Sequence, residues 1–125
     1  MTPIEIARRF YELNNTVPEG KASAAEMQDL LAPDFVFTGP LMKVEGAAAF
    51  MTMLGQFLPF HESVTVKQQI ASGDTVCSIT QLKLKTPAGG SLTVDVSEWL
   101  KMDDDRIKSL TIYYDPRDFV QAFPM

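Results

Sequence analysis

The sequence predicts an α+β domain in which helices, encoded first, cover one face of a curved antiparallel sheet encoded afterwards. Three observations favour this fold class. Apolar residues recur at helical spacing in the first half, β-branched residues alternate with polar ones from Ser63 onward, and short turn signals separate the alternating segments. A chain of 125 residues is long enough for one hydrophobic core, so residues 1–125 are expected to form a single domain.

The first expected helix begins at a capping box. The Thr2 side chain can cap the helix, Pro3 suits its first position, and Glu5 completes the box. An apolar stripe follows at helical spacing, and the polar pair Asn14-Asn15 is expected to end it. The stripe consists of Ile6, Phe10 and Leu13.

Two more helices and a strand are expected before residue 60. Ser23 repeats the cap signature and begins a short helix that ends before Pro33. A strand follows at 35–38, and a third helix is expected over 47–58, where Pro59 ends it. The buried sides of these two helices are expected to be Met27, Leu30 and Leu31 in one, and Phe50, Met53, Leu54 and Phe57 in the other.

The second half is expected to form four consecutive strands. Turn residues separate them by short intervals, so neighbouring strands should pair directly as an antiparallel meander. Asp115-Pro116 then combines a capping residue with a proline and is expected to open a short C-terminal helix that carries Phe119 and Phe123. The four strands cover residues 64–66, 75–85, 91–102 and 106–114.

Charge balance and the cysteine and histidine counts argue against several classes of function. A net charge of -5, a pI near 4.7 and eleven scattered Lys and Arg disfavour nucleic acid as a partner. No apolar segment approaches the ~20 residues of a membrane span, so no membrane partner is expected. The expected location is the cytoplasm. One cysteine, Cys77, and one histidine, His61, provide neither a disulfide nor the spacing of a zinc site, so no metal or cofactor is expected.

The stretch from Val94 to Leu100 places a carboxyl where an apolar residue is expected. If Val94, Val96 and Leu100 face the interior, period-two alternation puts Glu98 on the same face. Burial raises the pKa of a carboxyl, so Glu98 can act as an acid, or as a base near neutral pH. The alternative is a structural carboxylate that pairs with Thr80 or a lysine, or that lies in water at an open rim.

Three stretches of the sequence carry a family resemblance: LLAPDFVFTGP, VEGAAAF and DDRIKSLTIYYDPRDF. With the order of the expected elements, they resemble the nuclear transport factor 2-like superfamily over nearly the whole chain, and its SnoaL-like branch in particular. The resemblance implies a cone-shaped, cystatin-like fold with a bent sheet around a long helix, an apolar pocket at one end, and a homodimer through the outer sheet face. Members include ketosteroid isomerases, polyketide cyclases, limonene-epoxide hydrolases, dehydratases and non-catalytic binding proteins.

Most functional residues of the resembled enzymes have no counterpart here. The general base of ketosteroid isomerases falls on Gly39, and their oxyanion-stabilising Tyr falls on Phe10. Tyr11 lies one position further, which is expected to turn it by about 100° round the helix. A second oxyanion group, a protonated Asp, falls on Glu98, and the working Asp of SnoaL-like cyclases and limonene-epoxide hydrolases falls on Ile112. Glu98 alone keeps a carboxyl.

Four further side chains require an interpretation. Alternation places Tyr114 on the same face of its strand as the inward residues Leu110 and Ile112. Its hydroxyl therefore either points into the pocket or is the polar tip of an aromatic residue in the core. His61 titrates near neutrality, but its position just after Pro59 favours a solvated site at a helix C-terminus. Trp99 and Tyr113 have the opposite parity, and aromatic surface on the outer sheet face predicts a homodimer interface there.

The sequence therefore predicts a pocket for a small, mostly apolar molecule that carries one oxygen function. The expected reaction is proton transfer near a carbonyl, as in isomerisation, cyclisation or dehydration, with Glu98 as proton carrier and Tyr114 as donor to the oxyanion. The alternative is a non-catalytic ligand-binding or dimerisation module, and an open cavity that reaches Glu98 distinguishes the two. The expected lining is Phe10, Phe37, Met53, Phe57, Leu82, Val96, Leu110 and Ile112.

Overall fold

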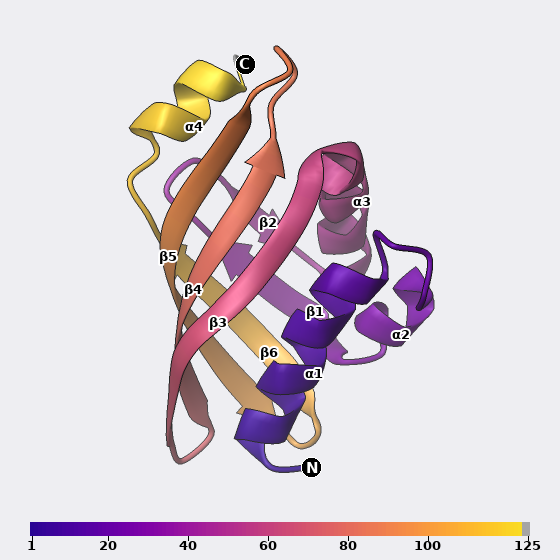
Figure 1. Cartoon of the computed structure of the whole chain (residues 1–125). Helices are drawn as coiled ribbons and strands as arrows, with labels where there is room; N and C mark the ends of the chain where they lie inside the picture. The colour runs from indigo at the N-terminus through magenta and orange to yellow at the C-terminus, as the bar shows by residue number, and fades with distance from the viewer. Residues whose placement is uncertain (124–125) are drawn as a thin grey trace.

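The computed structural model describes residues 1–123 and has the predicted α+β architecture (Figure 1). Six strands form one sheet, and α1, α2 and α3 lie on the same side of it. The helices are α1 (Pro3–Thr16), α2 (Ala24–Gln28), α3 (Ala47–Phe57), the short 3-10 helix η1 (Leu58–Phe60) and α4 (Arg117–Ala122). The strands are β1 (Leu31–Thr38), β2 (Lys43–Glu45), β3 (His61–Ser72), β4 (Thr75–Lys85), β5 (Ser91–Asp103) and β6 (Arg106–Tyr113).

The sheet has the strand order β2-β1-β6-β5-β4-β3. The last four strands form the predicted antiparallel meander. β1 comes from the first half of the chain and pairs in parallel with β6, which places Phe37 opposite Leu110. This parallel pairing was not predicted, because alternation within a strand identifies its buried face but not its neighbour.

Both predicted capping boxes are present, but the end predicted for the first helix was wrong. α1 continues through Thr16, past the Asn14-Asn15 pair. Asn14 Nδ2 donates to the Phe10 carbonyl at 2.8 Å, and Asn15 Nδ2 donates to the Val64 carbonyl of β3 at 2.9 Å. Asn14 bonds back to the carbonyl four residues earlier in the same helix and Asn15 bonds to β3, so both amides are satisfied while the helical backbone is kept.

The second helix is also shorter than predicted. α2 ends at Gln28, and Leu31 begins β1 instead of lying on the helix. Pro33 lies within this strand, where a register shift between Leu31 and Val36 interrupts the pairing with β6. Because the pairing is interrupted there, the strand does not require the backbone N–H that proline lacks. The three-residue strand β2 was not predicted, whereas α3 ends at Phe57, one residue from its predicted end.

The core lies between the helices and the inner side of the sheet. The alternation predicted for β5 is confirmed, since Val96, Glu98 and Leu100 are buried whereas Asp95 and Trp99 face outward. Large, fully buried side chains come from helices and strands alike, namely Ile6, Leu13, Leu31, Phe35, Phe50, Leu100 and Ile107.

Aromatic rings pack together where α4 meets α3. The ring of Phe57 lies 5.9 Å from that of Phe119 and 6.0 Å from that of Phe123, measured between centroids. The predicted short C-terminal helix is present, but its N-cap is Pro116 instead of Asp115. The Asp115 carboxylate accepts a hydrogen bond from the Arg117 backbone N–H at 3.1 Å, just before the helix. The C-terminal helix thus anchors one end of the region enclosed by sheet and helices.

Candidate functional site

A cavity of about 300 Å³ lies between the helices and the inner side of the sheet. This volume is at the lower end of the ~300–1,000 Å³ typical of small-molecule sites. Every residue that the sequence predicted for the pocket lies in its wall, and the wall is otherwise mostly apolar. These residues are Phe10, Phe37, Met53, Phe57, Leu82, Val96, Leu110 and Ile112, with Glu98 and Tyr114 as polar groups.

The Glu98 carboxyl is buried in the cavity wall, with 9% of the residue exposed. The Thr80 hydroxyl of β4 donates a hydrogen bond to Glu98 Oε2 at 2.7 Å, a contact that the sequence had offered as one alternative. Burial raises the pKa of Glu98 from 4.5 to about 7, although the nearby hydroxyls of Thr80 and Tyr11 act in the opposite direction. At neutral pH this carboxyl is therefore divided between its ionised and protonated forms.

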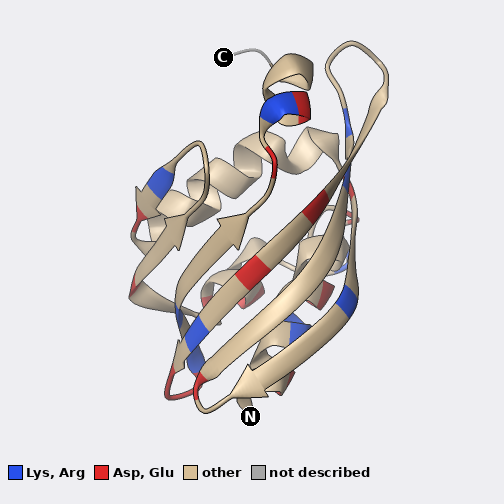
Figure 2. Cartoon of the chain, turned by 90° about the vertical axis from the view of Figure 1, so that its left-hand side faces the viewer, with Lys and Arg blue, Asp and Glu red and all other residues tan. Residues whose placement is uncertain are grey.

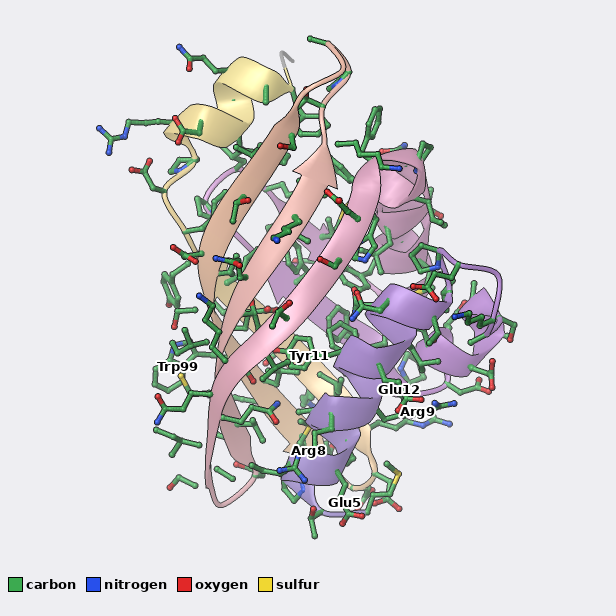
Figure 3. The ribbon with its side chains drawn as sticks, viewed as in Figure 1. Glu5, Arg8, Arg9, Tyr11, Glu12 and Trp99 are labelled. Carbon is green, nitrogen blue, oxygen red and sulfur yellow. The ribbon has the colours of Figure 1, made fainter. Side chains whose placement is uncertain are left out.

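Tyr11 lies in the cavity wall, so the prediction that it turns away from the pocket was wrong. Figure 3 places Tyr11 between α1 and the strands, and only 4% of the residue is exposed. Its buried hydroxyl makes no hydrogen bond within residues 1–123. Glu98 and Ser78 lie close enough to influence its pKa, yet neither meets the geometry of a hydrogen bond to it.

Tyr11 and Glu98 form one polar end of the cavity, and their surroundings determine which group carries a proton. Burial, followed by the negative charge of Glu98, raises the pKa of Tyr11 far above its usual range, so its hydroxyl stays protonated. Thr80 directs its proton to Oε2 of Glu98, which leaves Oε1 free to hold or release a proton. A ligand oxygen at this end can accept a hydrogen bond from Tyr11.

The two positions where the resembled enzymes carry Asp are in contact with each other. A Cβ atom added to Gly39 would lie 3.3 Å from Cγ1 of Ile112 and 3.4 Å from Cζ of Phe37. Apolar packing therefore fills the space that a carboxylate at either position would need. Among the described residues that line the cavity, Glu98 is the one carboxyl.

His61 is a further polar group in the wall; it lies at a helix C-terminus as predicted, as the C-cap of η1, but it is half-buried instead of solvated. It is half-buried, begins β3 and lines the cavity. A register shift between His61 and Ser63 marks a β-bulge, a device that changes the direction of neighbouring side chains. Its Nε2 lies 3.2 Å from Oδ1 of Asn15. Burial, opposed by the charge of Glu19, lowers the pKa of His61, so the ring is neutral at neutral pH.

Tyr114 lies just past β6 and lines the cavity near α4. Its ring is half-buried and packs edge-on against Phe119, with 6.1 Å between the ring centroids. Burial raises the pKa of its hydroxyl, which is therefore protonated at neutral pH. Tyr114 thus combines the two arrangements considered from sequence, an aromatic packing contact and a place in the cavity wall.

The outer face of the sheet carries an apolar band. Trp99 and Tyr113 lie there as predicted, with 46% and 59% of their surfaces exposed, together with Ile70 and Ile79. Strand pairing places Ile70 beside Cys77 and Cys77 beside Trp99, so the band crosses β3, β4 and β5. In Figure 2 the ribbons of β3, β4 and β5 are mostly uncharged along their length, and Figure 3 shows Trp99 on the side of the sheet away from α1.

The bent sheet, the helices on one side of it and the cavity between them are those of a nuclear transport factor 2-like protein. Residues 7–110, most of the chain, match the SnoaL-like domain. The protein therefore belongs to the SnoaL-like domain family, and the resemblance inferred from the sequence is confirmed.

Solved structures with the same fold are distant in sequence. A nuclear transport factor 2-like protein of unknown function from Cytophaga hutchinsonii is 24% identical, with 95% of each chain covered and a TM-score of 0.80. A proposed ketosteroid isomerase from Kribbella flavida is 20% identical, with 89% of this chain and 76% of that chain covered and a TM-score of 0.74. A proposed SnoaL-like polyketide cyclase from a Jannaschia species is 15% identical, with 96% and 90% covered and a TM-score of 0.81.

No curated protein matches this chain. Within residues 1–123, no helix has both the length and the hydropathy that a bilayer crossing requires. The same part of the chain contains no cluster of three His, Cys, Asp or Glu side chains arranged to hold a metal ion, and Asp103–Asp105 form the turn between β5 and β6.

Tyr11 and Asn15 are the site residues that sequence reasoning missed. A signal for them was present, because Ala7, Tyr11 and Asn15 follow one another at intervals of four residues and so share one side of α1. These residues lie next to Ile6 and Phe10 around the helix, and both sets contain buried residues. The buried side of α1 is thus broader than the single stripe that was predicted from Ile6, Phe10 and Leu13.

Proposed function

We propose that the protein binds a small, mostly apolar carbonyl compound in this cavity and catalyses proton transfer next to the carbonyl group. Reactions of this kind include isomerisation, cyclisation and dehydration. The observation that carries the proposal is the pairing of a buried carboxyl that titrates near neutrality with the buried Tyr11 hydroxyl, which has no hydrogen-bond partner among residues 1–123. Unpartnered buried donors are rare in proteins, and an oxygen of a bound ligand supplies the missing acceptor.

In the proposed reaction, ionised Glu98 accepts a proton from the carbon next to the carbonyl. The electron pair of the broken C–H bond moves toward the carbonyl oxygen, and the Tyr11 hydroxyl stabilises the resulting enolate by a hydrogen bond. Protonated Glu98 then returns the proton to a carbon of the same molecule, which completes an isomerisation. Tyr11 takes the donor role here instead of Tyr114, because Tyr11 lies beside Glu98 whereas Tyr114 packs against Phe119.

Exchange of the enolisable protons of α-tetralone in deuterium oxide tests this proposal by NMR. We expect the protein to accelerate the exchange above the buffer rate, and Glu98→Gln to abolish the acceleration. The rate should rise with pH through the pKa of about 7 and then level off, because the ionised carboxyl is the base. Asp95→Asn is the matched control, since Asp95 is an exposed carboxylate on the outer side of the same strand.

Two results would distinguish the proposed enzyme from a non-catalytic binding protein. Binding of α-tetralone without any acceleration of exchange would identify a non-catalytic binding protein. That class is favoured by the apolar packing of Gly39 against Ile112, which leaves the cavity with a single carboxyl. Equal acceleration by Glu98→Gln and the parent would contradict the role given to Glu98.

We also propose a homodimer through the outer face of the sheet. The apolar band that contains Ile70, Ile79, Trp99 and Tyr113 supports it, because exposed apolar patches on a sheet commonly mark an interface between copies. Trp99→Arg should convert the dimer to a monomer in light scattering coupled to gel filtration. Thr93→Arg, exposed on the same face of β5 toward its other end, should remain dimeric, and a parent that elutes as a monomer at all concentrations would refute the dimer.

A further inference from the structure

We propose that the cavity recognises its ligand at two ends, and that His61 accepts a hydrogen bond from a hydroxyl group of the ligand through Nδ1. The inference rests on the proposed function, because it describes a second contact made by the same carbonyl compound. It narrows the ligand to hydroxy-carbonyl compounds, with the hydroxyl group at the end of the molecule opposite the carbonyl.

The orientation of the Asn15 amide is fixed by the backbone of β3. Asn15 Nδ2 donates to the Val64 carbonyl at 2.9 Å, and Asn15 Oδ1 accepts from the Val64 N–H at 2.8 Å. A backbone carbonyl needs a donor and a backbone N–H needs an acceptor, so the reversed amide would lose both bonds. The atom that faces His61 is therefore the oxygen.

That oxygen determines which nitrogen of His61 carries the proton. Asn15 Oδ1 lies 3.2 Å from His61 Nε2 and can only accept, so Nε2 must be the donor. In the neutral ring the proton on Nε2 leaves Nδ1 with a lone pair. Within residues 1–123, Nδ1 makes no hydrogen bond, and the residue lines the cavity. His61 is thus an acceptor without a protein donor.

The neighbouring Asn14 gives this end of the cavity the same character. Asn14 also lines the cavity, and its Nδ2 donates to the Phe10 carbonyl at 2.8 Å, which leaves Oδ1 as an acceptor beside one remaining N–H donor. The end at Glu98 differs, because the Tyr11 hydroxyl there is a donor without an acceptor. A ligand that satisfies both ends needs an acceptor oxygen at one end and a donor hydroxyl at the other.

The spacing of the two ends suits a small bicyclic compound. Asn15 lies four residues after Tyr11, or about 6 Å along the axis of α1. The strand neighbour of Glu98 on β4 is Ser78, but its carboxylate reaches Thr80, which donates the hydrogen bond to Oε2. Thr80 lies four residues, or roughly 13 Å along β4, from Leu84, the strand neighbour of His61. A fused two-ring skeleton with oxygen atoms at opposite ends falls within this interval, and a single carbonyl group cannot reach both ends.

Matched tetralone probes test the inference by isothermal titration calorimetry. The probes are α-tetralone, its phenolic hydroxytetralone isomers, and the corresponding methoxytetralones, which cannot donate a hydrogen bond. We expect at least one hydroxytetralone to bind about fivefold more tightly than its methoxy counterpart, as one added hydrogen bond implies. His61→Phe should remove this preference, whereas Glu62→Ala, an exposed neighbour on the same strand, should retain it.

The outcomes distinguish this inference from the proposed function. Binding of the tetralones without a preference for any hydroxyl isomer, or a preference that survives in His61→Phe, would overturn the role of His61 and leave carbonyl binding intact. Absence of binding by every probe would overturn the proposed function, and this inference with it. Nitrogen NMR of the free protein provides a test that needs no ligand, since a proton found on Nδ1 of the neutral ring instead of Nε2 would also refute it.

Discussion

Replacement of Glu98 by Gln is expected to increase the free energy of unfolding by about 3 kcal/mol at pH ~8 while leaving it nearly unchanged at pH ~4. The pKa of Glu98 is raised from 4.5 to about 7 in the folded protein, so the folded state binds more protons than the unfolded state between these values. Stability therefore falls as pH rises through this window and stays low above it. Gln keeps an oxygen for the Thr80 hydroxyl but has no charge to bury.

Urea unfolding of the parent and of Glu98→Gln at both pH values measures this effect. Asp95→Asn serves as the control, because Asp95 is exposed on the outer side of the same strand and its neutralisation should leave the pH dependence in place. Parallel pH profiles for the parent and Glu98→Gln would mean that Glu98 is hydrated or paired, and its assignment as a proton carrier would then lose its basis.

Tyr11→Phe is expected to change stability and ligand binding in opposite directions. Removal of a buried hydroxyl that has no hydrogen-bond partner in the described part of the chain should increase the free energy of unfolding by about 1–2 kcal/mol. The same change should weaken α-tetralone binding by roughly tenfold, because the ligand oxygen loses its donor. Thermal unfolding of the free protein and calorimetric titration of α-tetralone measure the two quantities.

A loss of both stability and affinity in Tyr11→Phe would contradict this account, since it would give the hydroxyl a partner within the protein. Tyr114→Phe is the matched control, because it removes a half-buried hydroxyl from the same cavity without touching the Glu98 end. The control should leave the stability within about 0.5 kcal/mol of the parent.

The sequence predicted the fold class and the meander well, because the signals for them are local. Alternation along β5 places Glu98 on the inner face whichever strands pair with it, and short turns between β-branched segments lead consecutive strands to pair with each other. The same locality explains why β2 and the parallel partner of β1 were missed. A three-residue strand and a pairing between distant segments leave no periodic pattern in the sequence.

The candidate site was predicted in part, and its missing residues share a physical cause. Glu98 was found because a carboxyl is conspicuous among apolar residues. Tyr11 was placed on the wrong side of the helix, because it lies about 100° from Phe10 around the helix axis. A helix enclosed by a curved sheet buries a broad arc, so two adjacent positions can both face the cavity. Asn15 and His61 could not be paired from sequence, since the contact depends on how closely α1 packs against β3.

The parallel pairing of β1 with β6 also constrains the order in which the molecule can form. β1 is the first strand of the described sheet along the chain, yet its neighbour on one side is β6, which follows the other five. During translation, the apolar face of β1, with Phe35 and Phe37, therefore stays without that neighbour until β6 has left the ribosome. The sheet is completed late in folding, by a contact between segments far apart in the sequence. Residues 106–113 join β1 to the meander and so close the wall of the cavity.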